Sequence, residues 1–419
     1  MVPKGWSKLS FNELLISTDI LGIQDGNHGN DHPKASDYVE SGIPFIMARD
    51  LKQGTLDFSQ CAYITKKQAD SLRIGFSKPG DILLTHKGTI GEVAIVPDSY
   101  EYVMLTPQVT YYRLNTNGRL HGKYLFQYFL GEQYQSKLKT LATQSTRSYL
   151  GITAQKDLDI NLPPLNEQKK IANILSTWDK AIIITEQLLA NSQQQKKALM
   201  QQLLTGKKRL RDNKGVRFCG EWKLDKLSKI FERVTTKNDG KSTNVVTISG
   251  QQGLIRQEDF FKKSVASDIL DGYFLLMKGQ FAYNKSYSNG YPMGAIKRLN
   301  RYADGVVTTL YICFEISEST KANGDFWEHY FESGLLNKGL SQIAHEGGRA
   351  HGLLNVKPTD FFSLKVPLPS LDEQQKIATV LTVADREITI LQQKLAALKQ
   401  EKQALMQQLL TGKRRVKIN

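Results

Sequence analysis

The sequence lacks any long hydrophobic run. None of its stretches approaches the ~20 consecutive apolar residues that a membrane-spanning helix requires. The first residues, among them Lys4, Trp6 and Lys8, form no apolar block, so we expect no secretory signal. With 419 residues, 40% of them hydrophobic and 23% charged, the chain has the composition of a globular protein with two or more domains.

Cysteine is also scarce. The three cysteines, Cys61, Cys219 and Cys313, are odd in number and far apart in the sequence. This pattern excludes a full disulfide framework and a zinc site made only of cysteine, and it is typical of a reducing compartment. We therefore expect a cytoplasmic protein.

The motifs of common nucleotide-dependent enzymes are missing. No Gly-x-x-x-x-Gly-Lys-Ser/Thr loop is present, so we do not expect this chain to hydrolyse ATP. Asn161-Leu-Pro-Pro-Leu165 differs from the Asn-Pro-Pro-aromatic loop of adenine methyltransferases, because a leucine follows the asparagine and no aromatic residue follows the prolines. The cysteines show no pairing with a base in the sequence. We predict no catalytic residues.

One segment does carry side chains that metal ions use. Asp25-Gly-Asn-His-Gly-Asn-Asp-His32 holds two aspartates and two histidines within eight residues, a composition that could bind a metal. The calcium-loop pattern fails, because Gly29 replaces an oxygen ligand and no glutamate stands at the twelfth position. We interpret the segment as a polar surface loop and predict no metal site.

Positive charge is in excess, and it is concentrated in two short zones. The formal net charge is +15. Residues 166–215 hold 10 basic and 4 acidic groups, and residues 372–419 hold 9 and 5, whereas residues 1–165 hold 17 and 16. A basic surplus is typical of nucleic-acid-binding proteins, although a generally basic protein would also show it.

A repeat divides the chain into two halves. Residues 162–172 recur at 368–378, and residues 196–209 recur at 402–415, both at an offset of 206 residues. Between 162 and 209, 28 of 48 positions are identical to the second copy. The repeat defines four parts, two long variable segments that are each followed by a repeated segment. We place these parts at residues 1–162, 163–210, 211–367 and 368–419.

Both repeated segments have the pattern of a long helix. Seam residues recur at alternating steps of four and three, which is the heptad spacing of a coiled coil. The first seam comprises Ile171, Leu175, Trp178, Ile182, Thr185, Leu189, Ser192, Lys196, Leu199 and Leu203. The second seam comprises Ile377, Leu381, Ala384, Ile388, Leu391, Leu395, Leu398, Lys402, Leu405 and Leu409.

The ends of these helices carry start and stop signals. Asn166 and Asp372 follow prolines closely and are expected to be N-caps, and Gln375 has the spacing of a capping box. Gly206 and Gly412 are expected to end the helices. About 40 residues at 1.5 Å each make a helix of ~60 Å.

Each seam needs a partner surface to cover it. The simplest solution pairs the two copies antiparallel within one chain, as an intramolecular coiled coil with a pseudo-two-fold and the globular segments at its two ends. The polar positions Thr185, Ser192 and Lys196 would then set register or orientation. An intermolecular coiled coil that dimerises the protein is the alternative.

The long segments alternate short strand-like runs with turn residues. Examples are residues 80–88 and 89–96 in the first segment and 278–286 in the second, while helical patches at 123–141 and 326–344 come late in each. We predict an α+β protein in which two long antiparallel helices separate two irregular α/β domains.

Polar loops at matching places in both halves could read DNA bases. Arginine can pair with guanine, and asparagine or glutamine with adenine. The candidate DNA-binding residues are Thr85, His86, Lys87, Gln144, Thr146, Arg147, Tyr149, Tyr283, Asn284, Lys285, Asn289, Arg349 and His351. Solvated loops without a ligand are the alternative interpretation.

Taken together, the whole chain resembles the DNA-specificity subunit of a bacterial Type I restriction–modification system. The residues that carry the resemblance are the Pro-Pro-Leu-x-Glu-Gln lead-in (162–168 and 368–374), the closing Leu-Leu-Thr-Gly-Lys (203–207 and 409–413), and Asp25–His28, Gly42–Phe45 and Gly80–Leu83. At 368–374 the lead-in departs from the family pattern at Ser370. The recognition domains vary within this family, so base contacts are not carried over.

The resemblance implies a non-catalytic subunit of a methyltransferase and ATP-dependent endonuclease. Each of its two target-recognition domains would read one half of a bipartite site in double-stranded DNA, and the paired helices would set the spacing. Two methyltransferase subunits would dock on the helices, and restriction subunits would join them. S-adenosylmethionine, ATP and Mg²⁺ would belong to those partners, with no cofactor in this chain.

Three other interpretations stay open at this point. A nuclease or fused methyltransferase would show catalysis by the purified chain. A coiled-coil adaptor with protein-binding ends would show no sequence-selective DNA binding. The specificity subunit of a system that cleaves on both sides of its site would share the same architecture.

Overall fold

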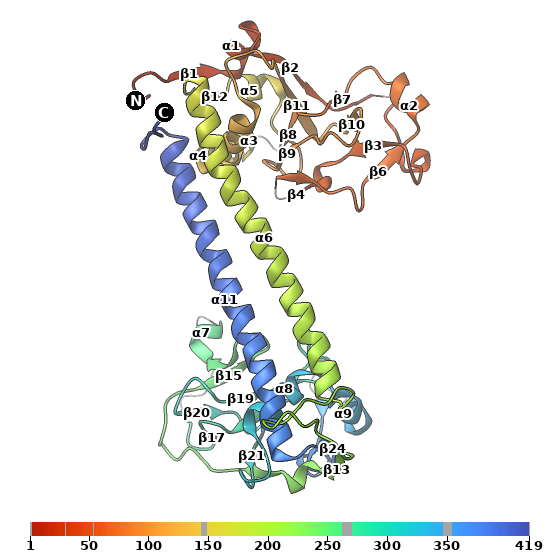
Figure 1. Cartoon of the computed structure of the whole chain (residues 1–419), viewed down its shortest axis with the longest axis vertical. Helices are drawn as coiled ribbons and strands as arrows, with labels where there is room; N and C mark the ends of the chain where they lie inside the picture. Colours follow the sequence, from red (N-terminus) through yellow and green to blue (C-terminus); the bar gives the residue numbers. More distant parts are fainter. Residues whose placement is uncertain are drawn as a thin grey trace. The chain divides into compact units, whose positions relative to one another are not determined.

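The chain folds into two compact units. The computed structural model describes residues 2–29, 31–52, 54–143, 149–261, 270–346 and 354–418. Unit 1 comprises residues 1–186 and 393–419, and unit 2 comprises residues 187–392. Two long helices, α6 (Leu165–Leu203) and α11 (Leu371–Leu409), each contribute one end to each unit (Figure 1). The predicted α+β class is confirmed.

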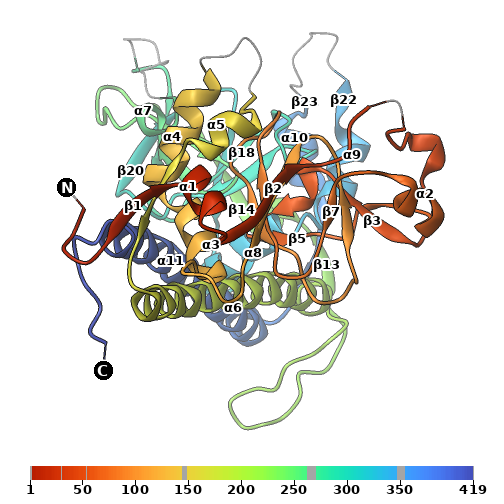
Figure 2. The same cartoon turned by 90° about the horizontal axis from the view of Figure 1, so that it is seen from above.

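Unit 1 is built around two four-stranded sheets. The first has the antiparallel order β2-β11-β8-β9, and the second has the order β6-β3-β10-β7, in which β3 and β10 are parallel. Figure 2 shows the second sheet, with α2, to one side of the first. The strands of unit 1 are β1 (Ser7–Ser10), β2 (Ile20–Asp25), β3 (Ile43–Ile46), β4 (Leu51–Lys52), β5 (Thr55–Leu56), β6 (Ala62–Ile64), β7 (Phe76–Ser77), β8 (Ile82–Thr85), β9 (Val93–Ile95), β10 (Val103–Leu105), β11 (Val109–Leu114) and β12 (Asp159–Leu162). Its shorter helices are α1 (Phe11–Ile16), α2 (Lys66–Ser71), α3 (Gly122–Leu130), α4 (Glu132–Thr143) and α5 (Ile152–Lys156).

Unit 2 repeats the first of these sheets. Its antiparallel sheet has the order β14-β21-β18-β19, which corresponds strand for strand to β2-β11-β8-β9. The strands of unit 2 are β13 (Lys223–Lys226), β14 (Phe231–Val234), β15 (Val246–Ser249), β16 (Gly253–Arg256), β17 (Phe274–Met277), β18 (Phe281–Asn284), β19 (Ala295–Arg298), β20 (Asp304–Val307), β21 (Ile312–Ile316), β22 (His345–Glu346), β23 (Leu354–Asn355) and β24 (Lys365–Leu368). Its shorter helices are α7 (Gln257–Phe261), α8 (Gly324–Glu332), α9 (Asn337–Ile343) and α10 (Pro358–Ser363).

A glycine interrupts each late helical patch. The predicted patch at 123–141 is two helices, α3 and α4, because Gly131 is extended rather than helical. The patch at 326–344 is likewise α8 and α9, separated by a turn in which Gly334 has a φ of 76°. The buried residues of α3 and α8 pack in the cores of unit 1 and unit 2.

The long helices pair antiparallel within each unit. In unit 1 the Lys402 Nζ lies 2.5 Å from Asp179 Oδ1, and Lys399 Nζ lies 2.7 Å from Glu186 Oε1, so residue numbers fall along α11 as they rise along α6. In unit 2 the Lys196 Nζ lies 2.5 Å from Asp385 Oδ1. This is the same Lys–Asp pair, displaced by 206 residues in both partners.

The seam positions lie inside this pairing. All ten positions of the first seam and all ten of the second are buried or half-buried. Toward the helix ends the seam joins the domain cores. Ile171, Leu175 and Leu409 pack with the aromatic core of unit 1, and Leu203, Ile377 and Leu381 pack with that of unit 2. Each unit is therefore a recognition segment fused to one end of the helix pair.

Both helices begin earlier than the sequence predicts. Asn166 and Asp372 lie inside the first turn, so their prediction as N-caps is wrong, and the predicted capping role of Gln375 falls with it. The helical hydrogen bonds start at Pro164, whose carbonyl accepts from the Gln168 amide at 3.0 Å. Gly206 and Gly412 follow the last turns with φ values of 70° and 71°, a conformation that suits glycine.

Among the described residues, no helix is both long enough and apolar enough to cross a bilayer.

Two isoleucines of α6 in unit 1 test the seam against the exposed face of the same helix. Ile171 is fully buried, whereas Ile184 is 55% exposed. We expect Ile171→Ala to lower the free energy of unfolding by about 2–5 kcal/mol, and Ile184→Ala to change it by less than about 0.5 kcal/mol. Urea-induced unfolding measures both, and equal effects would contradict the buried seam.

A double-mutant cycle tests the Lys–Asp pair in the seam. The side chains of Lys402 and Asp179 are 13% and 29% exposed, whereas Lys399 in its pair with Glu186 is 53% exposed. We expect Lys402→Met and Asp179→Asn to show a coupling of about 1–3 kcal/mol in unfolding free energy. The matched cycle Lys399→Met with Glu186→Gln should give less than about 1 kcal/mol. A larger coupling for the exposed pair would refute this interpretation.

Candidate nucleic-acid interface

Four of the candidate DNA-binding residues meet in unit 1 at the end of β8. Thr85 ends this strand, and His86 and Lys87 follow it. Lys87 forms an antiparallel bridge with Tyr149, and the Leu150 amide donates to the His86 carbonyl at 2.9 Å. The fold thus brings together two segments that are far apart in the sequence.

These four side chains divide into an exposed pair and a buried pair. Lys87 is exposed, and Tyr149 is 42% exposed. Thr85 is fully buried, and its Oγ1 accepts from the Glu92 amide at 2.9 Å. His86 is 1% exposed. Thr85 and His86 were predicted to contact bases, but neither side chain is exposed in this structure. Their contacts lie within the protein.

Buried polar groups converge on the carbonyl oxygen of Leu150. It accepts from Gln155 Nε2 at 3.0 Å and lies 3.1 Å from His86 Nδ1. Gln155 Nε2 also donates to Thr110 Oγ1 at 3.1 Å, and Thr110 Oγ1 donates to Asp25 Oδ1 at 2.5 Å. The network joins the ends of β2, β8 and β11 to the segment that begins at Tyr149.

Asp25 also faces His86. Its Oδ1 lies 3.3 Å from His86 Nε2, which makes no hydrogen bond to a described residue. Burial lowers the pKa of His86 below its ordinary value, and the negative charge of Asp25 opposes this effect. Because a carbonyl oxygen can only accept, Nδ1 must carry the hydrogen in the contact with Leu150.

Unit 2 places its candidates at the corresponding end of β18. Tyr283 is fully buried and donates its hydroxyl to the Met293 carbonyl at 2.7 Å, so it too lacks an exposed side chain for a base contact. Asn284 and Lys285 are half-buried, and the Leu354 amide donates to the Lys285 carbonyl at 2.9 Å. Lys285 Nζ lies 3.5 Å from the Val356 carbonyl, and burial lowers its pKa.

A second exposed group in unit 2 follows β18. Asn289 is exposed in the turn that Ser288 and Tyr291 close by an antiparallel bridge. Tyr287 in the same turn is 63% exposed, and sequence reasoning did not select it. Tyr287 could have been selected from the sequence, because it is an aromatic residue close to Asn289 in a polar segment.

Five candidates lie outside the described residues. They are Gln144, Thr146, Arg147, Arg349 and His351. Their contact with DNA stays a prediction, as does that of Lys87, Tyr149, Asn284, Lys285 and Asn289.

Two side chains of the Asp25–His32 segment make contacts within the protein. Asp25 accepts from Thr110, and His32 Nδ1 lies 2.9 Å from the Asn27 carbonyl. His28 is exposed. Within the described ranges no group of three or more His, Cys, Asp or Glu side chains could hold a metal ion. The three cysteines are free thiols.

A buried carboxylate lies at the start of each long helix, at the junction where the helix meets the segment that follows the other long helix. In unit 1, Glu167 accepts from Trp6 Nε1 at 3.0 Å and from Arg415 Nε at 2.6 Å. In unit 2, Glu373 accepts from Trp222 Nε1 at 2.9 Å and from Arg209 Nε at 2.6 Å. Sequence reasoning noticed the repeated Glu-Gln pair only as part of the repeat. Its exact duplication was the signal for a shared contact.

The adjacent glutamines fix each recognition segment to its helix. Gln168 accepts from the His121 amide at 2.8 Å and donates to the Arg119 carbonyl at 2.8 Å. Gln374 accepts from the Asn323 amide at 2.9 Å and donates to the Lys321 carbonyl at 3.1 Å. Both side chains are fully buried. The chain entering α3 or α8 is thus fixed by the helix that follows the domain.

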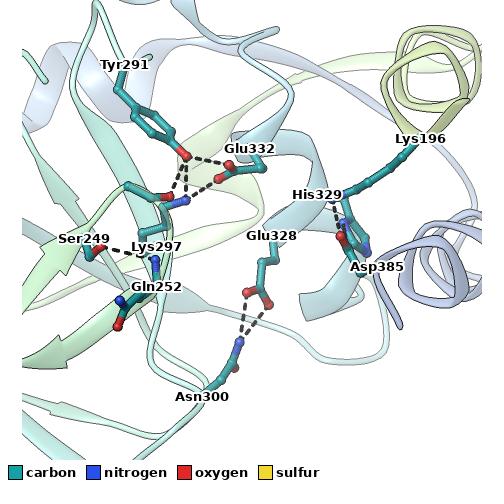
Figure 3. Close-up of polar contacts among 11 residues, drawn as sticks. Lys196, Ser249, Gln252, Tyr291, Lys297, Asn300, Glu328, His329, Glu332 and Asp385 are labelled. Carbon is teal, nitrogen blue, oxygen red and sulfur yellow. Dashed lines mark hydrogen bonds and ion pairs between the residues drawn. The ribbon is translucent and has the colours of Figure 1, made fainter. Parts of the chain in front are cut away.

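In unit 2 a polar cavity of about 700 Å³ lies between α8, β19, the β15–β16 hairpin and the helix pair. Figure 3 shows Lys196 and His329 converging on Asp385 at one side. His329 Nε2 lies 3.2 Å from Thr382 Oγ1, and burial lowers the pKa of His329. Across the cavity Glu332 pairs with Lys297, so these charged groups neutralise one another.

Unit 1 has an apolar cavity at the corresponding place. About 610 Å³ in volume, it is lined by Phe126 and Leu130 of α3, Ile182 of α6 and Met406 of α11. Phe126 and Leu130 occupy the positions that Glu328 and Glu332 hold in α8, counted from the glycine that begins each helix. The two junctions therefore share their backbone contacts and differ in the chemistry beside them.

Comparison with known proteins gives a family. A model described as "Type I restriction modification DNA specificity domain" matches residues 18–191 and again residues 223–400. The MjaVIII specificity subunit of a type I restriction enzyme from Methanocaldococcus jannaschii is 27% identical over 413 residues, covering 90% of this chain and 88% of that protein.

Solved structures show the same fold. The S subunit of a Type I restriction–modification system from M. genitalium has a TM-score of 0.58 at 14% identity and covers 100% of both chains. A chain from a structural study of complex assembly in the type I system has a TM-score of 0.55 at 14% identity over 98% of both. With two matched segments across most of its length, this chain belongs to the Type I restriction–modification DNA-specificity family, and it is a DNA sequence-specificity subunit rather than an enzyme in its own right.

Proposed function

We propose that each recognition domain reads one half of a bipartite site in double-stranded DNA. One observation carries this proposal. The chain forms the same four-stranded sheet twice, and each time exposed polar residues lie near the end of the equivalent strand, β8 or β18. In unit 1 these are Lys87 and Tyr149, and in unit 2 Tyr287 and Asn289. Side chains of this kind supply phosphate contacts and base contacts in DNA-binding proteins.

The paired helices set the gap between the two half-sites. Both α6 and α11 run from one unit into the other, and each has 39 residues, a length of about 58 Å at 1.5 Å per residue. Half-sites one helical turn of DNA apart are separated by about 34 Å. The buried seam and the repeated junctions supply the stiffness that a spacer needs.

The partners are DNA and the other subunits of a Type I system. Two methyltransferase subunits dock on the paired helices, and restriction subunits join that complex. S-adenosylmethionine, ATP and Mg²⁺ belong to these partners, and the chain itself holds no cofactor. The complex works in the cytoplasm, where DNA is accessible.

Lengthening both helices tests the spacer role. One heptad inserted after Glu186 in α6 and another after Gln392 in α11 preserves the seam. We expect the gap in the methylated motif to grow by at most about three base pairs, since seven residues add ~10 Å. Methylome sequencing of a host expressing the complete system measures the gap. A seven-residue Gly-Ser insertion at Gly215, in an exposed turn, is the control and should leave the gap unchanged. An unchanged gap after the heptad insertions would refute the spacer role.

Exchanging one domain tests the division of the site. Replacing residues 1–160 by the first recognition domain of another family member should change one half of the methylated motif and leave the other half intact. The helices and the second domain stay as they are, so the gap serves as the control. A motif altered in both halves would contradict separate reading by the two domains.

A further inference from the structure

Three contacts hold the backbone of Leu150, next to the exposed Lys87 and Tyr149 of unit 1. Its amide donates to the His86 carbonyl at 2.9 Å, and its carbonyl faces both Gln155 Nε2 at 3.0 Å and His86 Nδ1 at 3.1 Å. Leu150 is 3% exposed, whereas the preceding Tyr149 is exposed. Whatever holds Leu150 therefore also sets where Tyr149 meets solvent.

Unit 2 holds the corresponding backbone segment, at Leu354, with different side chains. Counted from the glycine before each strand, His86 corresponds to Lys285, and the Leu354 amide bonds to the Lys285 carbonyl as Leu150 does to His86. Lys285 Nζ reaches the Val356 carbonyl at 3.5 Å. Tyr283 stacks on Phe361 of α10 with ring centroids 5.4 Å apart. A titratable imidazole in unit 1 thus stands where unit 2 has a lysine beside an aromatic pair.

We propose that His86 is a positioning residue of the first recognition domain, which fixes Tyr149 and Leu150 through its Nδ1 donor and thereby sharpens the reading of one half-site. This proposal rests on the proposed function. It assigns His86 no contact with DNA, since its side chain is 1% exposed. Gln155 and the Thr110–Asp25 pair complete the anchor from α5, β11 and β2.

The sign of the pH dependence follows from the burial of the ring. Among the described residues, the titratable or charged groups that face it are Asp25 on β2, Lys87 next along the chain and the Tyr149 ring at 5.5 Å. Burial holds the pKa of His86 below 6.5 in the closed anchor. When the contacts between His86 and Leu150 are broken, the pKa of His86 returns to its ordinary value of about 6.5. Protonation therefore favours the broken state as pH falls below that value. Unit 2 has Lys285 in place of an imidazole at this position, so we expect the effect of this ring to be confined to the first half-site.

Three variants distinguish the effect of the hydrogen-bond donor from the effect of the titratable ring and from a general effect on the fold. His86→Leu removes the donor at similar size. His86→Asn places an amide nitrogen at the position of Nδ1 and does not titrate. His28→Asn changes an exposed histidine in the same domain and is the matched control. Each full chain is assembled with its methyltransferase partner, and methylation of a random-sequence DNA library is read at pH about 7.5 and about 6.

For the unmodified chain and His28→Asn we expect discrimination at the first half-site to fall more between pH 7.5 and 6 than discrimination at the second half-site. His86→Leu should lose roughly two- to tenfold in first-half discrimination at both pH values, the loss expected for one hydrogen bond. His86→Asn should retain most of the discrimination at pH 7.5 and show no pH dependence.

The half-sites control for one another. Equal relaxation of both halves by His86→Leu, no relaxation at all, or a pH dependence that persists in His86→Asn would overturn the positioning role. If His86→Leu fails to assemble, the pH profiles of the unmodified chain and His86→Asn decide by themselves. A library methylated with no bipartite motif by the unmodified complex would instead refute the proposed function.

Discussion

An amphipathic helix of 39 residues cannot leave its apolar stripe in water, so the rest of this chain depends on the contact between α6 and α11 within each unit. Ile171, Leu175 and Leu409 place that stripe in the core of unit 1, and Leu381 with Leu203 does the same in unit 2. Burial of such side chains contributes about 1.5–3 kcal/mol each. The recognition domains are built onto this contact, because their cores include the helix ends.

Buried charges give the hydrophobic contact its register. A carboxylate with 1% exposure, as in Glu167 and Glu373, is costly unless it is fully paired. Each pairs with an arginine and a tryptophan from segments remote in sequence, and each pairing forms only when both long helices and the recognition segment are in place. A helix pair shifted by one heptad would leave these carboxylates buried without partners. Polar contacts therefore select one alignment from the several that apolar seams allow.

Periodic and repeated features could be predicted from the sequence. Individual contacts between residues far apart in the sequence could not. The heptad spacing and the 206-residue offset were enough to predict two paired helices, because these patterns are local or duplicated. Asp25 was interpreted, with His28 and His32, as part of a polar surface loop. Its partners in the fold are Thr110 on β11 and His86 directly after β8, and only the fold brings these segments near. Thr85, His86 and Tyr283 were selected by residue type, and the burial of their side chains follows from strand pairing that no short window reveals.

The two units also show which parts of such a domain are free to vary. The bonds from Leu150 to His86 and from Leu354 to Lys285 join backbone atoms, so they persist whatever side chains stand there. The Gln168 and Gln374 contacts likewise bind backbone groups of the recognition segments. Around these fixed bonds the side chains differ, with Gln155 and His86 in one unit and Phe361 and Lys285 in the other. A framework held by backbone bonds lets the exposed residues change without loss of the fold, which is what a protein with two unlike reading surfaces requires.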